Sequence, residues 1–484
     1  MGLKMKNKTF ILAIDQGSSS TKAAAFGVQN GCLAAFAKTD IVLTSQQDHC
    51  EYKALDLLTS TQKVIEEILN QIPADQITEI ALSAQRSTIV FWDKLNGKAL
   101  APALSWLDGR AKEEIANNPL SQEVVHQKTG LYKTPYFSAS KIAWGLKNYP
   151  EVQNAFKEGR LCVGPVTSYL TWHLSGGKVF ACDYACAQRT LLFNINTFKW
   201  DEEILSSFNL TADILPQVVA SSGDFGTYKN IRITVSTGDQ QAACAACGVL
   251  EKGAALINYG TGAFFLLNIG HKSADVKGVL TSLAWSRPGR EPYYLLEAPL
   301  NTAGSFISWL QSLGLNFNVK KLDKIFAASK NPIWCLPALG GIGAPFFDFG
   351  LKPVFSNFLP STKKEDIIAG SMRGIVLLLC DIIYYLKQQG YNVESLQTSG
   401  GLSGANLMAF QAAILNLTIL QNKQKESTLT GAALIAALSK GLDISAWREL
   451  KNYERISPSI PPQEAAALYA KWSEFFAWSI KQVR

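Results

Sequence analysis

Charged residues are scarce in this sequence, and no stretch of the chain concentrates charge of one sign. Aspartate, glutamate, lysine and arginine make up only 18% of the 484 residues, and the formal net charge is +7. The positive charge is spread along the chain without a long lysine or arginine block, so nothing indicates a nucleic-acid partner. Histidine occurs only four times, at distant positions, and we assign none of the four a role.

The sequence also lacks an apolar run of the length that crosses a membrane. Residues 1–8 are polar and basic, and the apolar run after them is broken by Asp15, so no signal peptide is visible. The most apolar later stretch, residues 374–385, contains Asp381 and is too short to span a bilayer. We therefore expect a cytoplasmic protein with no membrane partner.

Cysteine occurs nine times, without the regular pairing of a disulfide framework. An odd number of scattered cysteines in a long chain favours reduced, buried thiols. Cys244 and Cys247 have the spacing of a redox or metal pair, but they lie in an alanine-rich stretch with no second pair nearby. Core packing is therefore the favoured interpretation of both.

The rest of the composition is that of a globular protein large enough for two domains. Hydrophobic residues make up 47% of the chain, which argues against a disordered protein. A length of 484 residues exceeds what one hydrophobic core usually supports. We therefore expect two domains.

Residues 10–26 form the most informative stretch. An apolar run ends in Asp15 to Gly17, a turn rich in hydroxyl groups follows, and a second apolar run begins after Lys22. This pattern predicts strand, tight turn and strand, with Gly17 allowing a close backbone approach. The hydroxyl and N–H groups of the turn suit phosphate oxygens, and Asp15 is placed to bind hydrated Mg²⁺. The alternative is a surface hairpin with a solvated turn.

Residues 253–269 repeat this pattern in the second half of the chain, with Gly260, Thr261 and Gly262 between two apolar runs. One such hairpin near the start of each half indicates a weak internal duplication. Two turns that face each other could hold a polyphosphate from both sides. The pair therefore favours phosphate binding more than either hairpin does alone.

Polar and aromatic side chains follow predicted strands in the first half. Arg86 comes after the strand at 77–83, and Trp106 lies in the polar segment 105–110, a make-up typical of ligand pockets. Arg86 could donate several hydrogen bonds to hydroxyls, and Trp106 could form an apolar wall. The alternative is a surface arginine and a core tryptophan.

Asp239 lies at a predicted turn between a strand, residues 231–235, and an alanine-rich helix that extends to residue 249. A carboxylate there stays ionised because the N-terminus of a helix favours negative charge. A helix cap is the simpler interpretation. Gly400 and Gly401 lie between another strand and helix, where glycine lets a flat ring or a phosphate approach the backbone.

Together these segments resemble the FGGY carbohydrate kinases of the actin-like ATPase superfamily, and among them the glycerol kinases. The resemblance covers nearly the whole chain. It rests on ordered motifs: Asp-Gln-Gly at 15–17, Gln-Arg at 85–86, Trp-x-Asp-x-Arg at 106–110, the family signature at 136–144, Arg-Thr-Leu-Leu-Phe at 189–193, Gly-Asp-Gln-Gln at 238–241 and Gly-Thr-Gly at 260–262.

The resemblance implies an α/β fold of two actin-like ATPase (ribonuclease H-like) domains with a cleft between them. Residues 1–250 would form the N-terminal domain, with the polyol site and the first phosphate loop, and residues 251–484 the nucleotide-binding C-terminal domain. The implied reaction transfers the γ-phosphoryl group of ATP, with Mg²⁺, to a primary hydroxyl of a small polyol or sugar such as glycerol. The resemblance leaves a homodimer open.

The resemblance also implies roles for individual residues. Asp239 would be the catalytic base, and Asp15 would help to hold Mg²⁺. The acceptor would be surrounded by Arg86, Ser87, Trp106, Tyr136, Asp239, Gln240 and Phe264. The nucleotide would contact Gly17, Ser18, Ser19, Ser20, Lys22, Gly260, Thr261, Gly262, Gly304, Gly400, Gly401 and Asn406.

Several positions depart from the glycerol kinase pattern. Ser87 stands where those enzymes carry a glutamate that binds glycerol hydroxyls, so the pocket has more room and one charge fewer. Lys22 replaces an arginine, and Ser308 replaces a glutamine near the adenine. The Gly-Lys-Gly loop tied to fructose-bisphosphate control is absent between residues 226 and 233, so we expect no such control.

Other functions stay open at this point. Ser87 leaves room for a pentulose such as xylulose or ribulose, or for a tetritol, and it is the only support for a catalytically weak regulator. A non-metabolic actin-like ATPase would share the two phosphate turns. Such a protein needs no polyol pocket, so Arg86, Trp106 and Tyr136 argue against it.

Overall fold

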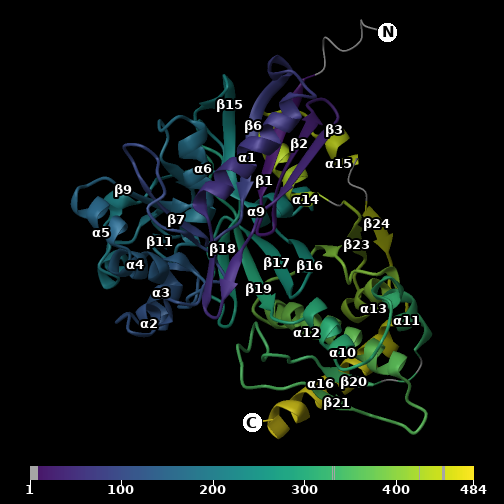
Figure 1. Cartoon of the computed structure of the whole chain (residues 1–484). Helices are drawn as coiled ribbons and strands as arrows, with labels where there is room; N and C mark the ends of the chain where they lie inside the picture. Colours follow the sequence, from purple (N-terminus) through teal and green to yellow (C-terminus); the bar gives the residue numbers. More distant parts are fainter. Residues whose placement is uncertain (1–8, 330, 332, 425, 450–452, 484) are drawn as a thin grey trace, which may run out of the picture.

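The computed structural model describes residues 9–329, 331, 333–424, 426–449 and 453–483. Figure 1 shows two lobes, one built mainly from the purple and blue first half of the chain and one from its green and yellow second half. Each lobe is organised around one large sheet flanked by helices. The expected two-domain α/β fold is therefore confirmed.

The sheet of the first lobe has six strands in the order β14-β15-β6-β1-β2-β3. Their bounds are β1 Phe10–Gln16, β2 Ser20–Gly27, β3 Leu33–Asp40, β6 Ile77–Ala84, β14 Thr227–Tyr228 and β15 Ile231–Gly238. β1 and β2 form the predicted hairpin, with Asp15 opposite Lys22. Because β6 runs parallel to β1 and β15 runs parallel to β6, the carboxyl ends of all three meet at one edge of the sheet.

The sheet of the second lobe repeats this arrangement. Its order is β18-β19-β17-β16-β22-β23-β24. The bounds are β16 Ala254–Tyr259, β17 Ala263–Gly270, β18 Leu280–Leu283, β19 Tyr294–Leu300, β22 Ser395–Gly400, β23 Ile419–Asn422 and β24 Tyr453–Ile456. An antiparallel hairpin of β16 and β17 is again followed by parallel strands, β22 beside β16 and β23 beside β22. The internal duplication predicted from the two hairpins is present in the topology.

A smaller sheet and its helices in the first lobe lie next in sequence to two aromatic residues of the predicted acceptor site, Trp106 and Tyr136. Its order is β4-β5-β8-β7-β9, with bounds β4 Thr44–Gln46, β5 His49–Tyr52, β7 Ile89–Asp93, β8 Ala103–Leu104 and β9 Leu161–Pro165. Its helices are α2 Lys112–Ala116, α3 Gln122–Thr129, α4 Ser138–Asn148 and α5 Pro150–Lys157. Trp106 follows β8, and Tyr136 precedes α4.

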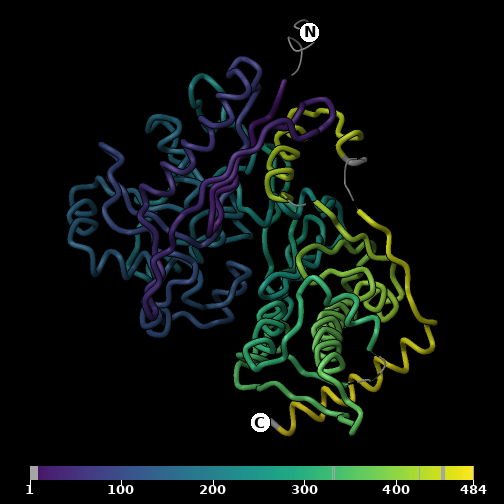
Figure 2. The backbone as a smooth tube through the Cα atoms, turned by 45° about the vertical axis from the view of Figure 1, so that its right-hand side comes forward, coloured from purple at the N-terminus to yellow at the C-terminus, as the bar shows by residue number. Residues whose placement is uncertain are grey.

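Helices from both halves of the chain cover the first sheet. α1 (Ala54–Leu69) and α6 (Val166–Leu174) share a core with one face, while α9 (Asp239–Ala246) and α14 (Ser427–Ser439) share a core with the other. Figure 2 shows the yellow-green α14 beside the purple N-terminal strands. α14 approaches α9 so closely that a Cβ on Gly431 would lie 1.7 Å from the carbonyl oxygen of Ala242. The second half of the chain thus completes the first lobe.

The helices of the second lobe surround α12 (Lys364–Gln388). They are α10 Gly304–Ser312, α11 Leu322–Ala328, α13 Ala405–Leu415 and α16 Pro462–Val483. The apolar stretch that looked too short to span a bilayer, residues 374–385, belongs to this longer helix. By length and composition α12 could cross a membrane, so that expectation was wrong on length, but 78% of its most apolar window is buried inside the protein. That burial is typical of a core helix.

The short elements complete the description. They are β10 Ala181–Asp183, α7 Tyr184–Gln188, β11 Phe193–Asn194, β12 Lys199–Trp200, α8 Glu202–Ser207, β13 Gln217–Val219, β20 Trp334–Leu336, β21 Val354–Ser356 and α15 Ser445–Glu449. None of the nine cysteines, all of which lie within the described residues, forms a disulfide, and all except Cys32 are buried, as expected. α9 ends at Ala246, three residues before the predicted end, and Gly248 has a φ of +75° just beyond it.

Candidate active site

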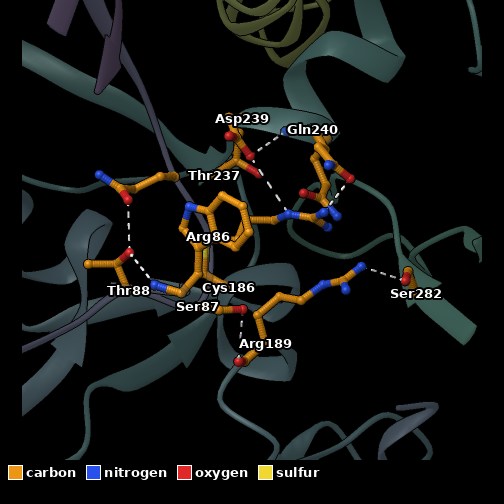
Figure 3. Close-up of polar contacts among 12 residues, drawn as sticks. Arg86, Ser87, Thr88, Cys186, Arg189, Thr237, Asp239, Gln240 and Ser282 are labelled. Carbon is orange, nitrogen blue, oxygen red and sulfur yellow. Dashed lines mark hydrogen bonds and ion pairs between the residues drawn. The ribbon is translucent and has the colours of Figure 1, made fainter. Parts of the chain in front are cut away.

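Three of the predicted site residues lie where the parallel strands of the first sheet end. Asp15 is near the end of β1, Arg86 follows β6, and Asp239 follows β15 as the first residue of α9. The adjacent ends of these strands bring together residues that are more than 200 positions apart. Figure 3 shows the interactions that join Arg86 to Asp239 and Gln240.

Asp239 combines partial burial with a positive neighbour. Its carboxylate is 34% exposed, and Oδ1 lies 3.7 Å from Arg86 Nε and accepts a hydrogen bond from the backbone N–H of Gln240 at 2.7 Å. Burial raises the pKa of Asp239, and Arg86 opposes the shift. The N-cap of α9 is Gly238, not Asp239. A Cβ on Gly238 would lie 2.9 Å from Arg86 Cδ, so the missing side chain leaves room for the arginine.

Asp15 has the environment of a cation ligand. Its Oδ1 is buried and has no hydrogen-bond partner in the described part of the chain. Burial, followed by the negative charge of Asp239, raises the pKa of Asp15 to about 7. An unpartnered carboxylate oxygen beside a second carboxylate fits a divalent cation, which would offset both effects.

The first turn is held by hydrogen bonds from neighbouring elements. The N–H of Gly17 donates to the carbonyl of Ser20 at 3.0 Å, Trp106 Nε1 donates to Ser18 Oγ at 3.2 Å, and Tyr52 donates to the Ser18 carbonyl at 2.9 Å. Ser19 is exposed, and Ser20 is partly buried. The predicted turn is thus linked directly to Trp106.

Lys22 contacts the second half of the chain. Its ammonium forms an ion pair of 2.8 Å with Glu426, the residue before α14, and both side chains are about a quarter to a third exposed. The positive charge that the resemblance places in the first phosphate loop therefore has a carboxylate partner within the protein.

The second turn is fixed to the start of α10. The N–H of Gly260 donates to Gly262, and the N–H of Gly304 donates to the Gly260 carbonyl at 3.0 Å. The Ser305 N–H and hydroxyl both donate to the Thr261 carbonyl. A Cβ on Gly304 would lie 2.7 Å from the Gly260 carbonyl oxygen, so this close packing requires glycine.

Glycines at the end of β22 lie beside this turn. Gly400 has a φ of +99°, and the Gly401 N–H donates to the Tyr259 carbonyl at 3.0 Å. Asn406, in the first turn of α13, donates its side-chain amide to Asp323 at 2.7 Å. Ser308 donates its hydroxyl to the Gly304 carbonyl at 3.1 Å. Apart from Gly17, the glycines predicted to meet the nucleotide therefore gather at one edge of the second sheet.

The predicted acceptor residues surround Arg86, with one exception. Arg86 is buried and donates Nη2 to Gln240, and the rings of Trp106 and Tyr136 pack 5.4 Å apart nearby. Phe264 lies in β17 opposite Pro299, and no hydrogen bond or ring contact joins it to the Arg86 group within the described residues.

Ser87 adopts an unusual backbone conformation beside these residues. Its φ is +62°, in the left-handed region, and its side chain is buried. Its hydroxyl donates to the Arg189 carbonyl at 3.4 Å, and Ser138 donates to the Ser87 carbonyl at 3.1 Å. Ser87 is therefore held by the Arg189 carbonyl and by the Ser138 hydroxyl.

Sequence reasoning missed two groups that support this site. Glu297, in β19, lies 3.6 Å from Arg86 and is also bound by Arg189. The feature of the sequence that could have pointed to Glu297 is a single acidic residue inside an apolar strand, Tyr294–Leu300. Lys141 is buried and donates to the carbonyls of Pro135 at 2.9 Å and Tyr136 at 2.7 Å, while burial lowers its pKa to about 7.

Comparison with known proteins identifies the family that shares this arrangement. Models of the N-terminal and C-terminal domains of the FGGY family of carbohydrate kinases match residues 10–255 and 255–439. A glycerol kinase of Mycoplasmoides gallisepticum is 31% identical over 97% of each chain. The structure of Plasmodium falciparum glycerol kinase with ADP superposes with a TM-score of 0.92 at 27% identity, over 98% of each chain. A xylulose kinase from Rhodospirillum rubrum shares the fold, with a TM-score of 0.87 at 18% identity over 98% of this chain and 99% of that chain.

Proposed function

The chain belongs to the FGGY family of carbohydrate kinases, and on this premise we propose that it transfers the γ-phosphoryl group of ATP to a primary hydroxyl of glycerol or a closely related small polyol. The observation that carries this proposal is the meeting of Asp15, Arg86 and Asp239 at one sheet edge. Relatives named glycerol kinases match almost the full length of the chain at about 31–32% identity.

Asp239 is the proposed base. Phosphoryl transfer through a loose transition state needs alignment and charge stabilisation more than a strong base, because the acceptor proton moves late. A carboxylate whose pKa is raised by burial accepts that proton more readily than a fully solvated one. The partial exposure of the Asp239 carboxylate leaves it accessible to a hydroxyl.

Arg86 is the proposed anchor of the acceptor. Its Nη1 is buried and has no hydrogen-bond partner within the described residues, so it can donate to a substrate hydroxyl. Trp106 and Tyr136 supply an apolar wall, and Ser87, Gln240 and Phe264 complete the proposed pocket. Exclusion of water from this pocket keeps water from competing as the phosphoryl acceptor.

The two glycine and hydroxyl turns are the proposed phosphate sites. One group comprises Gly17, Ser18, Ser19, Ser20 and Lys22, and the other comprises Gly260, Thr261, Gly262, Gly304, Gly400, Gly401 and Asn406. Asp15 would hold Mg²⁺, which when bound neutralises phosphate charge.

We also propose that residues 1–250 and 251–484 form the two domains and that the protein is cytoplasmic. We further propose that it forms a homodimer, which sedimentation can test.

Pentulose and tetritol kinases are the alternatives within the family, and an actin-like ATPase without a sugar substrate is the alternative outside it. The test is a panel of glycerol, erythritol, xylulose and ribulose with ATP, read as ADP release and as product mass. We expect the highest kcat/KM with glycerol. If a pentulose is the only substrate that is phosphorylated, the acceptor is that pentulose and not glycerol. ATP hydrolysis that no polyol changes would contradict the kinase proposal.

A further inference from the structure

Glu297 lies on β19 of the second sheet, yet its carboxylate contacts two arginines from the first half of the chain. Oε1 lies 3.6 Å from Arg86 Nη2, and Oε2 accepts hydrogen bonds from Arg189 and, at 2.9 Å, from Ser282 Oγ. Arg189 also donates to Ser282 Oγ at 2.7 Å. Glu297 therefore links the second sheet to the arginine that anchors the proposed acceptor.

Glu297 stays ionised in this position. Although burial alone would raise its pKa, Arg189 and Arg86 hold the pKa of Glu297 at about 2. Its side chain is only 3% exposed, and the side chains of Arg86 and Arg189 are 3% and 2% exposed. All three charges are thus shielded from solvent and depend on one another for compensation.

Within the four side chains that these contacts join, the charges balance. Arg86 and Arg189 supply two positive charges, and Asp239 and Glu297 supply two negative charges. A substrate that carries a charge into this group would lose its hydration without gaining an unpaired counter-ion. A neutral hydroxyl meets no such penalty.

The group nevertheless offers hydrogen-bond donors to an uncharged ligand. Arg86 Nη1 and Arg189 Nε are buried atoms without a hydrogen-bond partner in the described part of the chain. Ser87 is joined to both arginines: it follows Arg86 in the chain, and its hydroxyl donates a hydrogen bond to the Arg189 carbonyl. Its hydroxyl adds no charge to the group.

We propose that Glu297 is a specificity-determining residue: by balancing Arg189, it makes the acceptor site select uncharged polyols and reject acceptors that carry a carboxylate. The inference rests on the proposed kinase function and extends it to a substrate class. Glu297 acts through the two arginines and touches neither the reacting hydroxyl nor the nucleotide. Removal of its charge leaves a net positive site that suits a carboxylate.

The test compares glycerol with glycerate, which has the same chain length but a carboxylate in place of one terminal hydroxymethyl group. We measure kcat/KM for both acceptors in wild type and Glu297→Gln, and binding of both by calorimetry in the presence of a non-hydrolysable ATP analogue. We expect wild type to prefer glycerol by at least a hundredfold. In Glu297→Gln the ratio of glycerate to glycerol should rise at least tenfold in both measurements.

A matched control removes a buried carboxylate elsewhere. Glu79→Gln, in β6, loses the negative charge that pairs with Lys440 at 2.8 Å but keeps an acceptor for the Thr234 hydroxyl, and it should leave the ratio unchanged. An unchanged ratio in folded Glu297→Gln, or an equal rise in Glu79→Gln, would overturn the proposal. Wild type that phosphorylates no polyol would instead overturn the proposed function.

A second variant separates the charge from the reach of the side chain. Glu297→Asp keeps the negative charge and shortens the side chain, and it carries the test if Glu297→Gln does not fold. We expect it to lower kcat/KM for glycerol while retaining the wild-type rejection of glycerate. A raised ratio of glycerate to glycerol in Glu297→Asp would contradict the charge argument.

Discussion

The two lobes repeat one strand arrangement but equip it with different chemistry. In the first sheet, the strand ends carry charged side chains, with Asp15, Arg86 and Asp239 within one group. In the second sheet, the corresponding turn carries glycines whose backbone groups are packed against α10. We infer that charged side chains of the first lobe serve the acceptor and the cation, whereas close backbone approach in the second lobe serves the nucleotide. The turn of the first lobe adds a second contact to the phosphates.

Asp239→Asn gives the sharpest test of the charged lobe. The amide cannot take the acceptor proton, so we expect kcat to fall by about 10²–10⁴-fold. Calorimetric binding of Mg²⁺–ADP should change by less than about threefold. A variant that keeps more than a tenth of wild-type turnover would remove Asp239 from the role of base.

Ser87→Glu tests whether charged side chains of the first lobe determine which acceptor the enzyme prefers. A carboxylate at this position would accept hydrogen bonds from glycerol hydroxyls and reduce the room in the pocket. We expect kcat/KM for glycerol relative to erythritol to rise by about tenfold, the effect of one hydrogen bond to a charged group. An unchanged ratio would place Ser87 outside the pocket.

Gly304→Ala tests the backbone-lined lobe. The added Cβ would lie 2.7 Å from the Gly260 carbonyl oxygen and displace the second turn. We expect ADP to bind at least about tenfold more weakly, with little change in KM for the acceptor. Gly109→Ala, whose Cβ has no neighbour closer than 3.7 Å, is the matched control. Equal losses for ADP and acceptor would contradict the division of labour between the lobes.

The pH dependence of cation binding tests Asp15. In the protein without a cation its pKa is raised to about 7, so protons compete with Mg²⁺ as pH falls through that value. We expect Mg²⁺–ADP affinity to fall about fivefold between pH 7 and pH 6, as the ionised fraction drops. Asp15→Asn should lose this part of the pH slope; an identical slope in the variant would exclude Asp15 as the ligand.

Glu426→Gln gives the smallest expected effect and probes the contact between β2 and the start of α14. It frees Lys22 from a partly exposed ion pair of 2.8 Å. Since such pairs contribute about 0–1 kcal/mol, we expect ADP affinity to rise by no more than about fivefold. Lys22→Gln should lower it. Weaker ADP binding in Glu426→Gln would show that the pair supports the phosphate site instead of competing with it.

The sequence predicted those parts of the molecule whose structure follows from the pattern of neighbouring residues. The hairpins at 10–26 and 253–269, the strand before Arg86 and the strand-to-helix turn at Asp239 are all present. In each case, apolar periodicity and a glycine or polar turn lie within a few residues of one another.

Contacts between distant segments could not be predicted in this way. Glu297 meets Arg189 across 108 positions, and α14 crosses from the second half of the chain to the first sheet. Lys22 meets Glu426 across 404 positions. Each of these contacts depends on how the two sheets are placed, which periodicity along the chain does not record.

The central claim is that the two turns hold one nucleotide while Asp239 faces the acceptor between them. A crystal structure with Mg²⁺, a non-hydrolysable ATP analogue and glycerol tests it directly. We predict phosphates between residues 17–20 and residues 260–262, with the Asp239 carboxylate about 3 Å from a terminal hydroxyl of glycerol. A nucleotide bound away from both turns, or an acceptor out of reach of Asp239, would contradict the account.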